Sequence, residues 1–401
     1  MAINDRVSNF LTAGFYYKTF MWPAAFWEKL YEPIIRKAAG LGSLSMREDP
    51  DAYDKGFRHC DLLIIGAGPA GLMAALTAGR AGKEVILADE DFVLGGRLNA
   101  ETGLLEDDAW LQATIAELSS LPNVRLMPRT TVIGAFDHGI FGAVERVSDH
   151  LHTPDVGKPR QILWRIYAQQ SLLCAGATER PIAFENNDRP GIMLAGAVRT
   201  YVNRYAATPA QRVAVFTNND DGHRTAVDLQ ARGIKVAAVI DTRDDAPLAE
   251  TYEVIRGGQV VDSKGRLGLT FVEVKQADGS MRTVECGALG VSGGWNPNVH
   301  LTCHQRGRPT WDNDLAAFVP GGTLPPGMEV AGASNGVFST HGALTSGAKT
   351  AAKMMGVKAA KAPKAEDAPV TQTPFWYVEG CARAWLDQQN DVTVKDVKLR
   401  H

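Results

Sequence analysis

A glycine-rich turn between a short apolar run and an alanine-rich segment constrains the fold of this chain more than any other feature. Residues 62–65 are wholly apolar, which predicts a central parallel strand that is buried on both faces. Residues 66–71 then show the spacing G-x-G-x-x-G, and residues 72–79 predict a helix. A second strand is predicted at residues 84–88. This order of strand, glycine turn, helix and strand predicts a nucleotide-binding domain.

The residues of this turn have separate roles in binding a dinucleotide. Gly66 permits the tight turn, Gly68 lets a pyrophosphate approach the backbone, and Gly71 lets the helix pack closely on the strand. The helix N-terminus supplies free N–H groups to the phosphates. Asp89 and Glu90 follow the second strand, where a carboxylate can bind the ribose hydroxyls and disfavour a 2′-phosphate. We therefore predict a dinucleotide site; the alternative is a glycine turn that only packs a helix on a sheet.

Length and composition limit the number of domains and the kinds of partner and metal site that we expect. A chain of 401 residues is long enough for about two or three domains. Its formal net charge of −3 gives no indication of nucleic-acid or acidic-lipid binding. The five cysteines show neither C-x-x-C spacing nor a His/Cys cluster, so we predict no metal site, and a structural role is favoured for the adjacent Cys303 and His304. With no secretory signal and no run of membrane-spanning length, we expect a cytoplasmic protein with reduced thiols.

An aromatic segment precedes the nucleotide-binding domain. Residues 15–31 contain eight aromatic side chains among seventeen residues. Pro23 suits the first turn of a helix that would run to Gly40. We favour an interface with another protein over core packing for this arm. Lys18 lies inside the cluster, where it could meet an anionic ligand group or another subunit.

The sequence after the glycine turn predicts that the chain contains two nucleotide-binding folds, of which the second is a degenerate copy of the first. Residues 130–141 and 161–174 alternate in polarity, which predicts an antiparallel excursion before the chain crosses to the second copy. That copy has strands predicted at 212–216 and 235–240, but its loop 217–222 carries Asn-Asn-Asp-Asp in place of the glycine triplet. Because these carboxylates would repel a pyrophosphate, we predict that the second copy binds no nucleotide.

The return of the chain to the first domain bears on the choice of cofactor. We expect residues 286–291 to return to the first domain as a strand, and residues 329–331 to form its last strand. In FAD-binding members of this superfamily that strand is usually followed by Gly-Asp, whose carboxylate holds the ribityl chain. Here Ala333 follows Gly332. We therefore predict NAD as the cofactor, with FAD as the alternative.

These elements predict an α/β fold with two dinucleotide-binding domains, as in disulfide-reductase-like flavoproteins, of which the second is degenerate. The expected parts are an aromatic arm (1–58), the first dinucleotide-binding domain (59–184 and 286–356), the degenerate domain (185–285), a linker (357–373) and the start of a further domain (374–401).

Several stretches resemble the α subunit of heterotetrameric sarcosine oxidase and, more broadly, opine oxidase and hydrogen cyanide synthase subunits. They are residues 13–23, 176–181, 187–191, 291–297 and 389–393. The resemblance covers nearly all of this chain but only the middle of that subunit, without its ferredoxin-like and folate-binding aminomethyltransferase-like domains. It implies a complex that converts sarcosine, oxygen and water to glycine, formaldehyde and hydrogen peroxide. It further implies that a β subunit carries FAD and the substrate site, that covalent FMN lies at the α/β interface, and that the α subunit binds NAD.

The site predicted for this chain is therefore a cofactor site without catalytic residues. His300, His304 and His341 are isolated histidines for which a structural role is favoured. Two other hypotheses remain: a self-sufficient FAD-dependent amine or opine dehydrogenase, and a nucleotide-binding remnant without a partner. The candidate cofactor-binding residues are Gly66, Ala67, Gly68, Pro69, Ala70, Gly71, Asp89, Glu90, Gly96, Arg97, Ala175, Gly176, Gly332 and Ala333.

Overall fold

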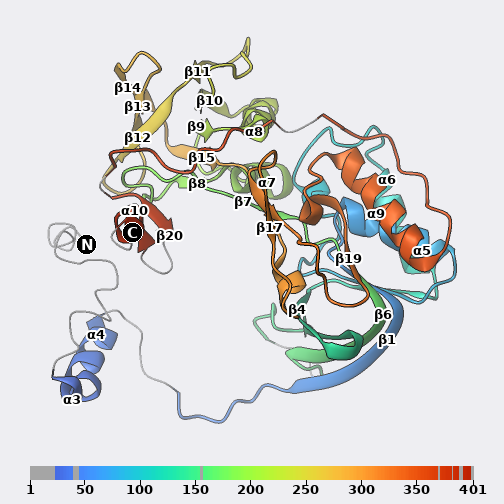
Figure 1. The fold of residues 1–401 in the computed structure, drawn as a ribbon. Helices are drawn as coiled ribbons and strands as arrows, with labels where there is room; N and C mark the ends of the chain where they lie inside the picture. Colours follow the sequence, from blue (N-terminus) through green and yellow to red (C-terminus); the bar gives the residue numbers. More distant parts are fainter. Residues whose placement is uncertain are drawn as a thin grey trace.

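Two sheets with mainly parallel strands organise the chain, one in each of two α/β units (Figure 1). The computed structural model describes residues 23–38, 45–153, 157–368, 371–381, 383–387 and 392–398. Within these residues no helix is both long enough and apolar enough to cross a membrane. The segments 1–22 and 388–391, with Lys18 and much of the predicted aromatic arm, lie outside the described residues.

The first sheet has seven strands in the order β3-β2-β1-β6-β5-β4, with β19 joined to β6. β1 pairs in parallel with β2 and with β6, whereas β4, β5 and β6 form the antiparallel excursion that the alternation predicted. The strands are β1 (Tyr53–Ile65), β2 (Val85–Ala88), β3 (Val124–Met127), β4 (Thr130–Phe136), β5 (Ile140–Arg146), β6 (Gln161–Leu173) and β19 (Met328–Val330).

The two faces of this sheet are covered by different material. Helices α5 (Pro69–Arg80), α6 (Trp110–Ser120) and α9 (Thr340–Met355) contribute to one apolar core with Leu62 and Ile64. On the other face Leu63 and Ile65 share a second core with the inner side chains of β4–β6, so the antiparallel part curls back over the parallel part. Alternate residues of one strand thus enter opposite cores, which explains the unbroken apolar run in the sequence.

The second unit contains five parallel strands in the order β11-β10-β9-β15-β8. Helices α7 and α8 pack on one face, and a three-stranded antiparallel sheet, β12-β13-β14, packs on the other. The elements are β8 (Ile192–Leu194), α7 (Ala195–Tyr205), β9 (Arg212–Thr217), α8 (Asp220–Ala231), β10 (Lys235–Asp241), β11 (Val254–Arg256), β12 (Gln259–Lys264), β13 (Phe271–Lys275), β14 (Met281–Glu285) and β15 (Ala288–Ser292).

The placement of β15 corrects our expectation that residues 286–291 return to the first domain. β15 is buried at every position and pairs with β9 and β8 of the second sheet. An apolar run predicts a buried strand but carries no information on which sheet it joins. The chain returns only afterwards, through β16 (Trp295–Pro297), which pairs antiparallel with β7 (Ala177–Glu179).

The N-terminus of α8, where a second pyrophosphate would bind, is closed by the protein itself. The Asn219 side chain accepts hydrogen bonds from the N–H groups of Asp221 and Gly222. The Asp220 N–H donates to the carbonyl of Thr371, at 3.2 Å. The N–H groups of Asp220, Asp221 and Gly222 at this helix end are therefore already bonded, which adds to the charge repulsion that the sequence indicated.

The described residues of the predicted linker, 357–368 and 371–373, pack across both units, although their composition predicted a linker. We call residues 357–368 and 371–373 the strap. Ala365 forms a β-bridge with Leu105 of the first unit, and Gln372 forms one with Asn219 of the second. The Glu366 carboxylate accepts a hydrogen bond from Arg224, at 2.6 Å. The strap therefore joins the two units instead of trailing from one of them.

The described residues after the strap pack mainly on the second unit. Tyr377 forms a β-bridge with Ala183, and Val378 joins the apolar core of the second unit. Whether they open a further domain stays a prediction. The remaining elements are β17 (Thr310–Asp312), β18 (Ala317–Val319), β20 (Trp385–Asp387), β21 (Val392–Thr393), α10 (Val394–Lys398), η3 (Gly96–Asn99), η4 (Asp137–Gly139), η5 (His300–Cys303) and η6 (Gly332–Asn335).

Residues 24–38 of the predicted aromatic arm form one helix with a π-helical turn, whereas β1 already begins at Tyr53, inside the range predicted for the arm. The helix comprises α3 (Ala24–Phe26), η2 (Trp27–Tyr31) and α4 (Glu32–Ala38). In η2 the N–H of Glu32 bonds to the carbonyl of Trp27, five residues earlier. Pro33 follows and cannot donate a backbone hydrogen bond, which accounts for a wider turn at this point. No residue of η2 is buried, and its role as an interface stays a prediction.

Buried charges join the two units at the crossover between them. Arg199 of α7 is 2% exposed and forms ion pairs with Glu101 (2.8 Å), Asp221 (3.5 Å) and Asp228 (3.7 Å). Nearby, Glu179 at the end of β7 accepts a hydrogen bond from the Gly196 N–H at the start of α7. Burial raises the pKa of Glu179 to about 7, an effect that the negative charge of Asp221 reinforces.

We predict that Glu179→Gln changes the pH dependence of folding. The wild-type carboxyl has its pKa raised on folding, so its proton stabilises the folded state at low pH, and this stability is lost as pH rises from about 4.5 towards 7. Gln keeps the acceptor for Gly196 without titrating. The free energy of unfolding of the variant, relative to wild type, should therefore increase by up to about 3 kcal/mol between pH 5 and 8. Urea unfolding across this range measures it, and parallel pH profiles would contradict it.

Candidate functional site

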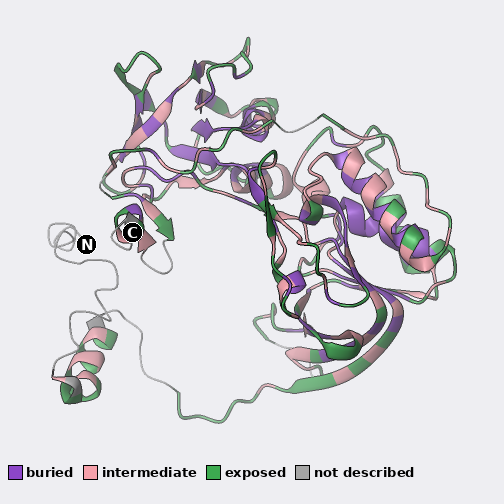
Figure 2. Cartoon of the chain, in the orientation of Figure 1, coloured by how far each residue is buried: buried purple, intermediate pink, exposed green. Residues whose placement is uncertain are grey.

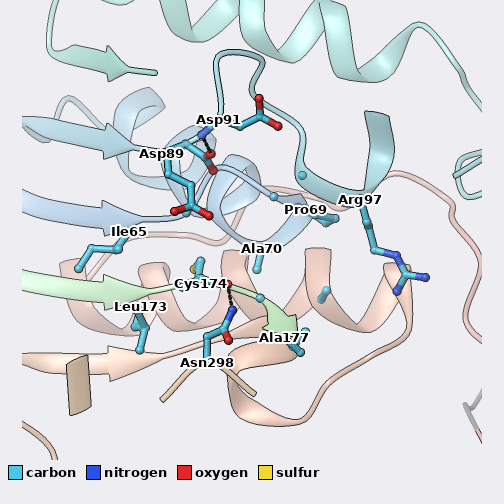
Figure 3. Close-up of a pocket in the computed structure, with 18 of the residues that line it drawn as sticks. Ile65, Pro69, Ala70, Asp89, Asp91, Arg97, Leu173, Cys174, Ala177 and Asn298 are labelled. Atoms are coloured by element: carbon cyan, nitrogen blue, oxygen red, sulfur yellow. Dashed lines mark hydrogen bonds between the residues drawn. The ribbon is translucent and has the colours of Figure 1, made fainter. Parts of the chain in front are cut away.

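A cavity of about 640 Å³ lies at the carboxyl ends of β1, β2 and β6. The last residues of these strands, Ile65, Ala88 and Leu173, line it, and Figure 3 shows the side chains gathered around it. Ligands of open α/β sheets bind at this edge, where the loops after the strands meet. The cavity therefore lies where the glycine motif predicts a dinucleotide.

The glycine turn places the N-terminus of α5 against this cavity. Gly66 has φ +100°, and a Cβ there would lie 2.4 Å from the carbonyl oxygen of Cys174. A Cβ on Gly71 would lie 1.9 Å from the carbonyl oxygen of Gly66, so the helix rests directly on the turn. A Cβ on Gly68, in contrast, would have no neighbouring atom within 4 Å. Gly68 therefore faces the open space that a pyrophosphate needs.

The N-terminus of α5 is uncapped, unlike those of two comparable helices. No side chain accepts a hydrogen bond from its first turn. α8 is capped by Asn219, and α9 is capped by Ser339, whose hydroxyl accepts from the Gly342 N–H at 3.2 Å. At α9 the His341 N–H also donates to the Glu366 carbonyl of the strap. Among these three helices, α5 alone presents uncapped N–H groups that suit an anion.

Asp89 supports the turn as well as lining the cavity. Its carboxylate accepts hydrogen bonds from the N–H groups of Ala67 (2.5 Å) and Asp91 (2.8 Å). Burial raises the pKa of Asp89, and these two hydrogen bonds lower it in part. Glu90 is exposed and also lines the cavity. The two predicted carboxylates thus lie together, but Asp89 already has two backbone partners.

Asp91 was missed by our sequence reasoning, although it also lines the cavity. Both of its carboxylate oxygens accept hydrogen bonds from the Arg204 guanidinium, at 2.5 and 2.8 Å. This bidentate pair lowers the pKa of Asp91. The cavity wall is therefore joined to α7 of the second unit through the pair between Asp91 and Arg204.

Arg97 lies beside the cavity with its charge already paired. Its guanidinium donates to both carboxylate oxygens of Glu101, at 3.0 and 2.6 Å, and to the carbonyl of Phe338, at 2.8 Å. Glu101 and Asp221 also line the cavity. Our sequence reasoning missed both, because their position depends on contacts between the two units. Phosphate recognition thus falls to the backbone of α5 more than to a free cation.

The loop after β6 forms the opposite wall. Asn298 donates from its side chain to the carbonyl of Ala175, at 2.8 Å, and the Ser334 hydroxyl donates to the carbonyl of Gly176, at 3.0 Å. Ala333 lines this wall, whereas Gly332 lies behind it with φ +68°. The predicted residues that line the cavity are Gly66, Gly68, Pro69, Ala70, Asp89, Glu90, Gly96, Arg97, Ala175, Gly176 and Ala333; Ala67, Gly71 and Gly332 do not.

Two of the three isolated histidines lie at the cavity. His300 and His304 line it, and the Nδ1 atom of His304 accepts a hydrogen bond from the Ala135 N–H, at 3.3 Å. His341 lies elsewhere, with its Nδ1 atom 3.3 Å from the Pro363 carbonyl oxygen. Among the residues that the structure describes, no group of three or more His, Cys, Asp or Glu side chains is placed to hold a metal ion. The geometry of the cavity suits holding a ligand.

Comparisons with known proteins support this description. Residues 61–138 match the family model of FAD dependent oxidoreductases. The chain is 44% identical to the alpha subunit of sarcosine oxidase from Rhizobium meliloti (strain 1021), over 99% of this chain and 41% of that protein. The corresponding protein of Corynebacterium sp. (strain P-1) is 40% identical, over 89% and 40%. The chain thus spans about two-fifths of the length of these relatives, and the predicted resemblance is confirmed.

More distant similarities agree with the fold. An opine oxidase subunit of Rhizobium meliloti is 25% identical over 82% of this chain and 68% of that protein. L-proline dehydrogenase from P. horikoshii has a TM-score of 0.59 at 21% identity, covering 80% of this chain and 59% of that one. Thioredoxin reductase from Lactococcus lactis has a TM-score of 0.57 at 16% identity, covering 74% and 98%. These two structures confirm the predicted two-domain fold and carry no further conclusion.

We predict that substitutions at two glycines of the turn affect different properties, nucleotide binding at Gly68 and stability at Gly71. Gly68→Val should weaken dinucleotide binding at least about tenfold without loss of stability, because its side chain enters open space that the pyrophosphate needs. Gly71→Ala should lower the free energy of unfolding by about 1–3 kcal/mol, because its Cβ meets the Gly66 carbonyl. Titration calorimetry and urea unfolding separate the two effects. Full nucleotide occupancy in Gly68→Val would refute the site.

Proposed function

We propose that this chain is an α-type subunit, or part of one, of a sarcosine-oxidase-like complex, in which it binds one NAD. The observation that carries the proposal is the 44% identity to the alpha subunit of a sarcosine oxidase over 99% of this chain. The dinucleotide cavity at the uncapped N-terminus of α5 supports the same conclusion. The complex would oxidise sarcosine with oxygen and water to glycine, formaldehyde and hydrogen peroxide.

The described cavity fits NAD. The backbone N–H groups at the start of α5 would hold the pyrophosphate, with Gly68 allowing its close approach. Asp89 and Glu90 would meet the adenosine ribose, where their negative charges oppose a 2′-phosphate. When bound, NAD supplies a nicotinamide ring that can accept a hydride; the residues of this chain bind and orient it.

The alternative, a self-sufficient FAD-dependent dehydrogenase, is favoured by one observation. Residues 61–138 match a family of FAD dependent oxidoreductases. Two features of the structure favour NAD instead. Ala333 offers no carboxylate to a ribityl chain, and the N-terminus of α9 is already capped by Ser339 and the strap. A remnant that binds nucleotide without a partner is the third hypothesis.

The chemistry of the proposed complex is assigned to a partner of this chain. In the proposed complex a flavin would take a hydride equivalent from sarcosine and pass the electrons to oxygen, and we place it on a β-type subunit together with the substrate. A covalent FMN at the contact between the two subunits belongs to the same proposal. In this proposal the present chain holds a nucleotide and positions its partner.

The test is to purify the chain alone, record its visible spectrum and identify the nucleotide released on denaturation. We expect a colourless protein that releases NAD. A yellow protein that releases FAD would overturn this proposal and place redox chemistry in this chain. Co-expression with the flavin-carrying subunit then tests for sarcosine-dependent production of hydrogen peroxide.

We also predict that the chain prefers NAD to NADP and that Glu90→Arg reduces this preference at least about fivefold. The substitution replaces a repelling charge with one that attracts the 2′-phosphate, worth about 1 kcal/mol at an exposed position. Asp137→Arg, at an exposed position away from the cavity, is the matched control and should leave the preference unchanged. Competition binding with both nucleotides measures the ratio. An unchanged ratio in Glu90→Arg would contradict the placement of the ribose.

A further inference from the structure

The segment around η5 is anchored on the outer edge of β4. β4 is the last strand in the order of its sheet, so within the described residues no strand pairs with that edge. The Ala135 N–H donates a hydrogen bond to the Nδ1 atom of His304, at 3.3 Å. The Gln305 side chain donates to the carbonyl of Phe136, at 2.7 Å. Two side chains therefore take the place of a partner strand and fix His304 beside the cavity.

The contact with Ala135 decides which ring nitrogen of His304 carries the proton. A backbone N–H can only donate, so Nδ1 must accept, and the neutral imidazole then has its hydrogen on Nε2. Among the described residues none accepts a hydrogen bond from Nε2. His304 is exposed and lines the cofactor cavity. The ring therefore offers the cavity one N–H donor for which the described protein has no acceptor.

His304 lies at the end of the cavity where the base of a dinucleotide would extend from its ribose. In the proposed function the adenosine ribose lies beside Asp89. The Thr130 N–H donates to the carbonyl of Asp89, at 2.7 Å, so β4 begins at the ribose position. Residues 131–133 of β4 then line the cavity. Because the pyrophosphate leaves the ribose towards Gly68, the base is left to extend along β4.

The walls at this end suit a flat base. Val132, Ile133 and Leu301 line it with apolar side chains. Leu301 is 8% exposed and belongs to the core beneath the sheet, whereas Ile133 is 53% exposed and available for contact. In Figure 2 the start of β1 is coloured mostly as exposed, and its end, which leads to Ile65 at the cavity, as buried. Apolar walls with a few placed polar groups are typical of cofactor sites.

We propose that His304 recognises the base of the bound dinucleotide by donating a hydrogen bond from Nε2 to a ring nitrogen of adenine. The proposal rests on the proposed function only in that this cavity binds an adenine dinucleotide. NAD and FAD share the adenosine half, so the contact is the same for either. The ring nitrogens of adenine accept hydrogen bonds, whereas its amino group donates. His304 thus supports β4 through Nδ1 and binds the base through Nε2.

Two substitutions separate the contacts of the two ring nitrogens. In His304→Asn the side-chain oxygen takes about the place of Nδ1, so Ala135 keeps its acceptor and only the Nε2 donor is lost. This variant should bind NAD about three- to tenfold more weakly, as expected for one neutral hydrogen bond. In His304→Gln the side-chain amide reaches the place of Nε2 and can donate, so NAD should bind at least about twofold more tightly than to His304→Asn.

His138→Asn is the matched control. His138 is exposed and does not line the cofactor cavity. Its φ of +61° lies in the left-handed region, which asparagine tolerates, so the variant should fold. Its affinity for NAD should change less than about twofold. Thermal unfolding of each variant confirms that it folds.

Analogues that lack one acceptor each test the contact itself. Competition binding to the purified chain compares NAD with its 1-deaza-, 3-deaza- and 7-deazaadenine analogues. One of the three should bind to the wild type about three- to tenfold more weakly than NAD, and His304→Asn should not distinguish that analogue from NAD. If denaturation releases FAD, the corresponding FAD analogues are the probes. A purely structural role of His304 would leave the discrimination between analogues unchanged in the variant.

The outcomes separate this inference from the proposed function. If the wild type binds all three analogues as tightly as the parent nucleotide, the inference is overturned and the function stands. Discrimination that persists in His304→Asn also overturns it. If His300→Asn abolishes the discrimination and His304→Asn does not, the base contact belongs to His300 and the inference is wrong. Release of FAD overturns the proposed function, and the FAD analogues then decide the inference.

Discussion

The close contact between the glycine turn and the strand beside it is the constraint on which the rest of the first unit depends. Gly66 adopts φ +100° against the carbonyl of Cys174, and Gly71 rests on the carbonyl of Gly66. These contacts fix α5 on the sheet with its N-terminus at the cavity. The Ala67 N–H is then aimed at Asp89, and Gly96 packs close to Gly68. One steric condition, which only glycine meets, therefore positions the carboxylate and the phosphate site together.

The cavity and the junction of the two units are parts of one charge network. Glu101 accepts hydrogen bonds from Arg97 at the cavity and forms an ion pair with Arg199 of α7. Burial lowers the pKa of Arg199, but the surrounding carboxylates more than compensate, so its pKa is raised. Removing one member of such a network leaves a buried charge without its partner, which is strongly destabilising. Because Arg97 is committed to this network, a bound nucleotide would depend on the backbone of α5 and would also stabilise the contact between the units.

Features set by neighbouring residues could be predicted from the sequence, whereas features set by distant contacts could not. The turn, α5 and the position of Asp89 follow from spacing within about 25 residues. β15 was assigned to the wrong sheet because its partners, β8 and β9, are remote in sequence and an apolar run does not name them. The strap was predicted as a linker because Ala, Lys and Pro are typical of linkers; its contacts with Asn219 and Leu105 exist only after folding. Glu101 and Asp221 were missed for the same reason.

Whether the N-termini of α5, α8 and α9 are free or capped bears on where a chain with two nucleotide folds can bind a nucleotide. α5 begins with uncapped N–H groups, α8 is closed by Asn219 and the strap, and α9 is closed by Ser339 and the strap. A two-domain flavoprotein that moves electrons between its own cofactors needs both nucleotide positions. In the function proposed here, closing the second position with the protein's own side chain and backbone would leave one nucleotide in this chain. In the function proposed here, electrons must therefore come from or go to a cofactor on another subunit, which makes the surface that holds that subunit part of the chemistry.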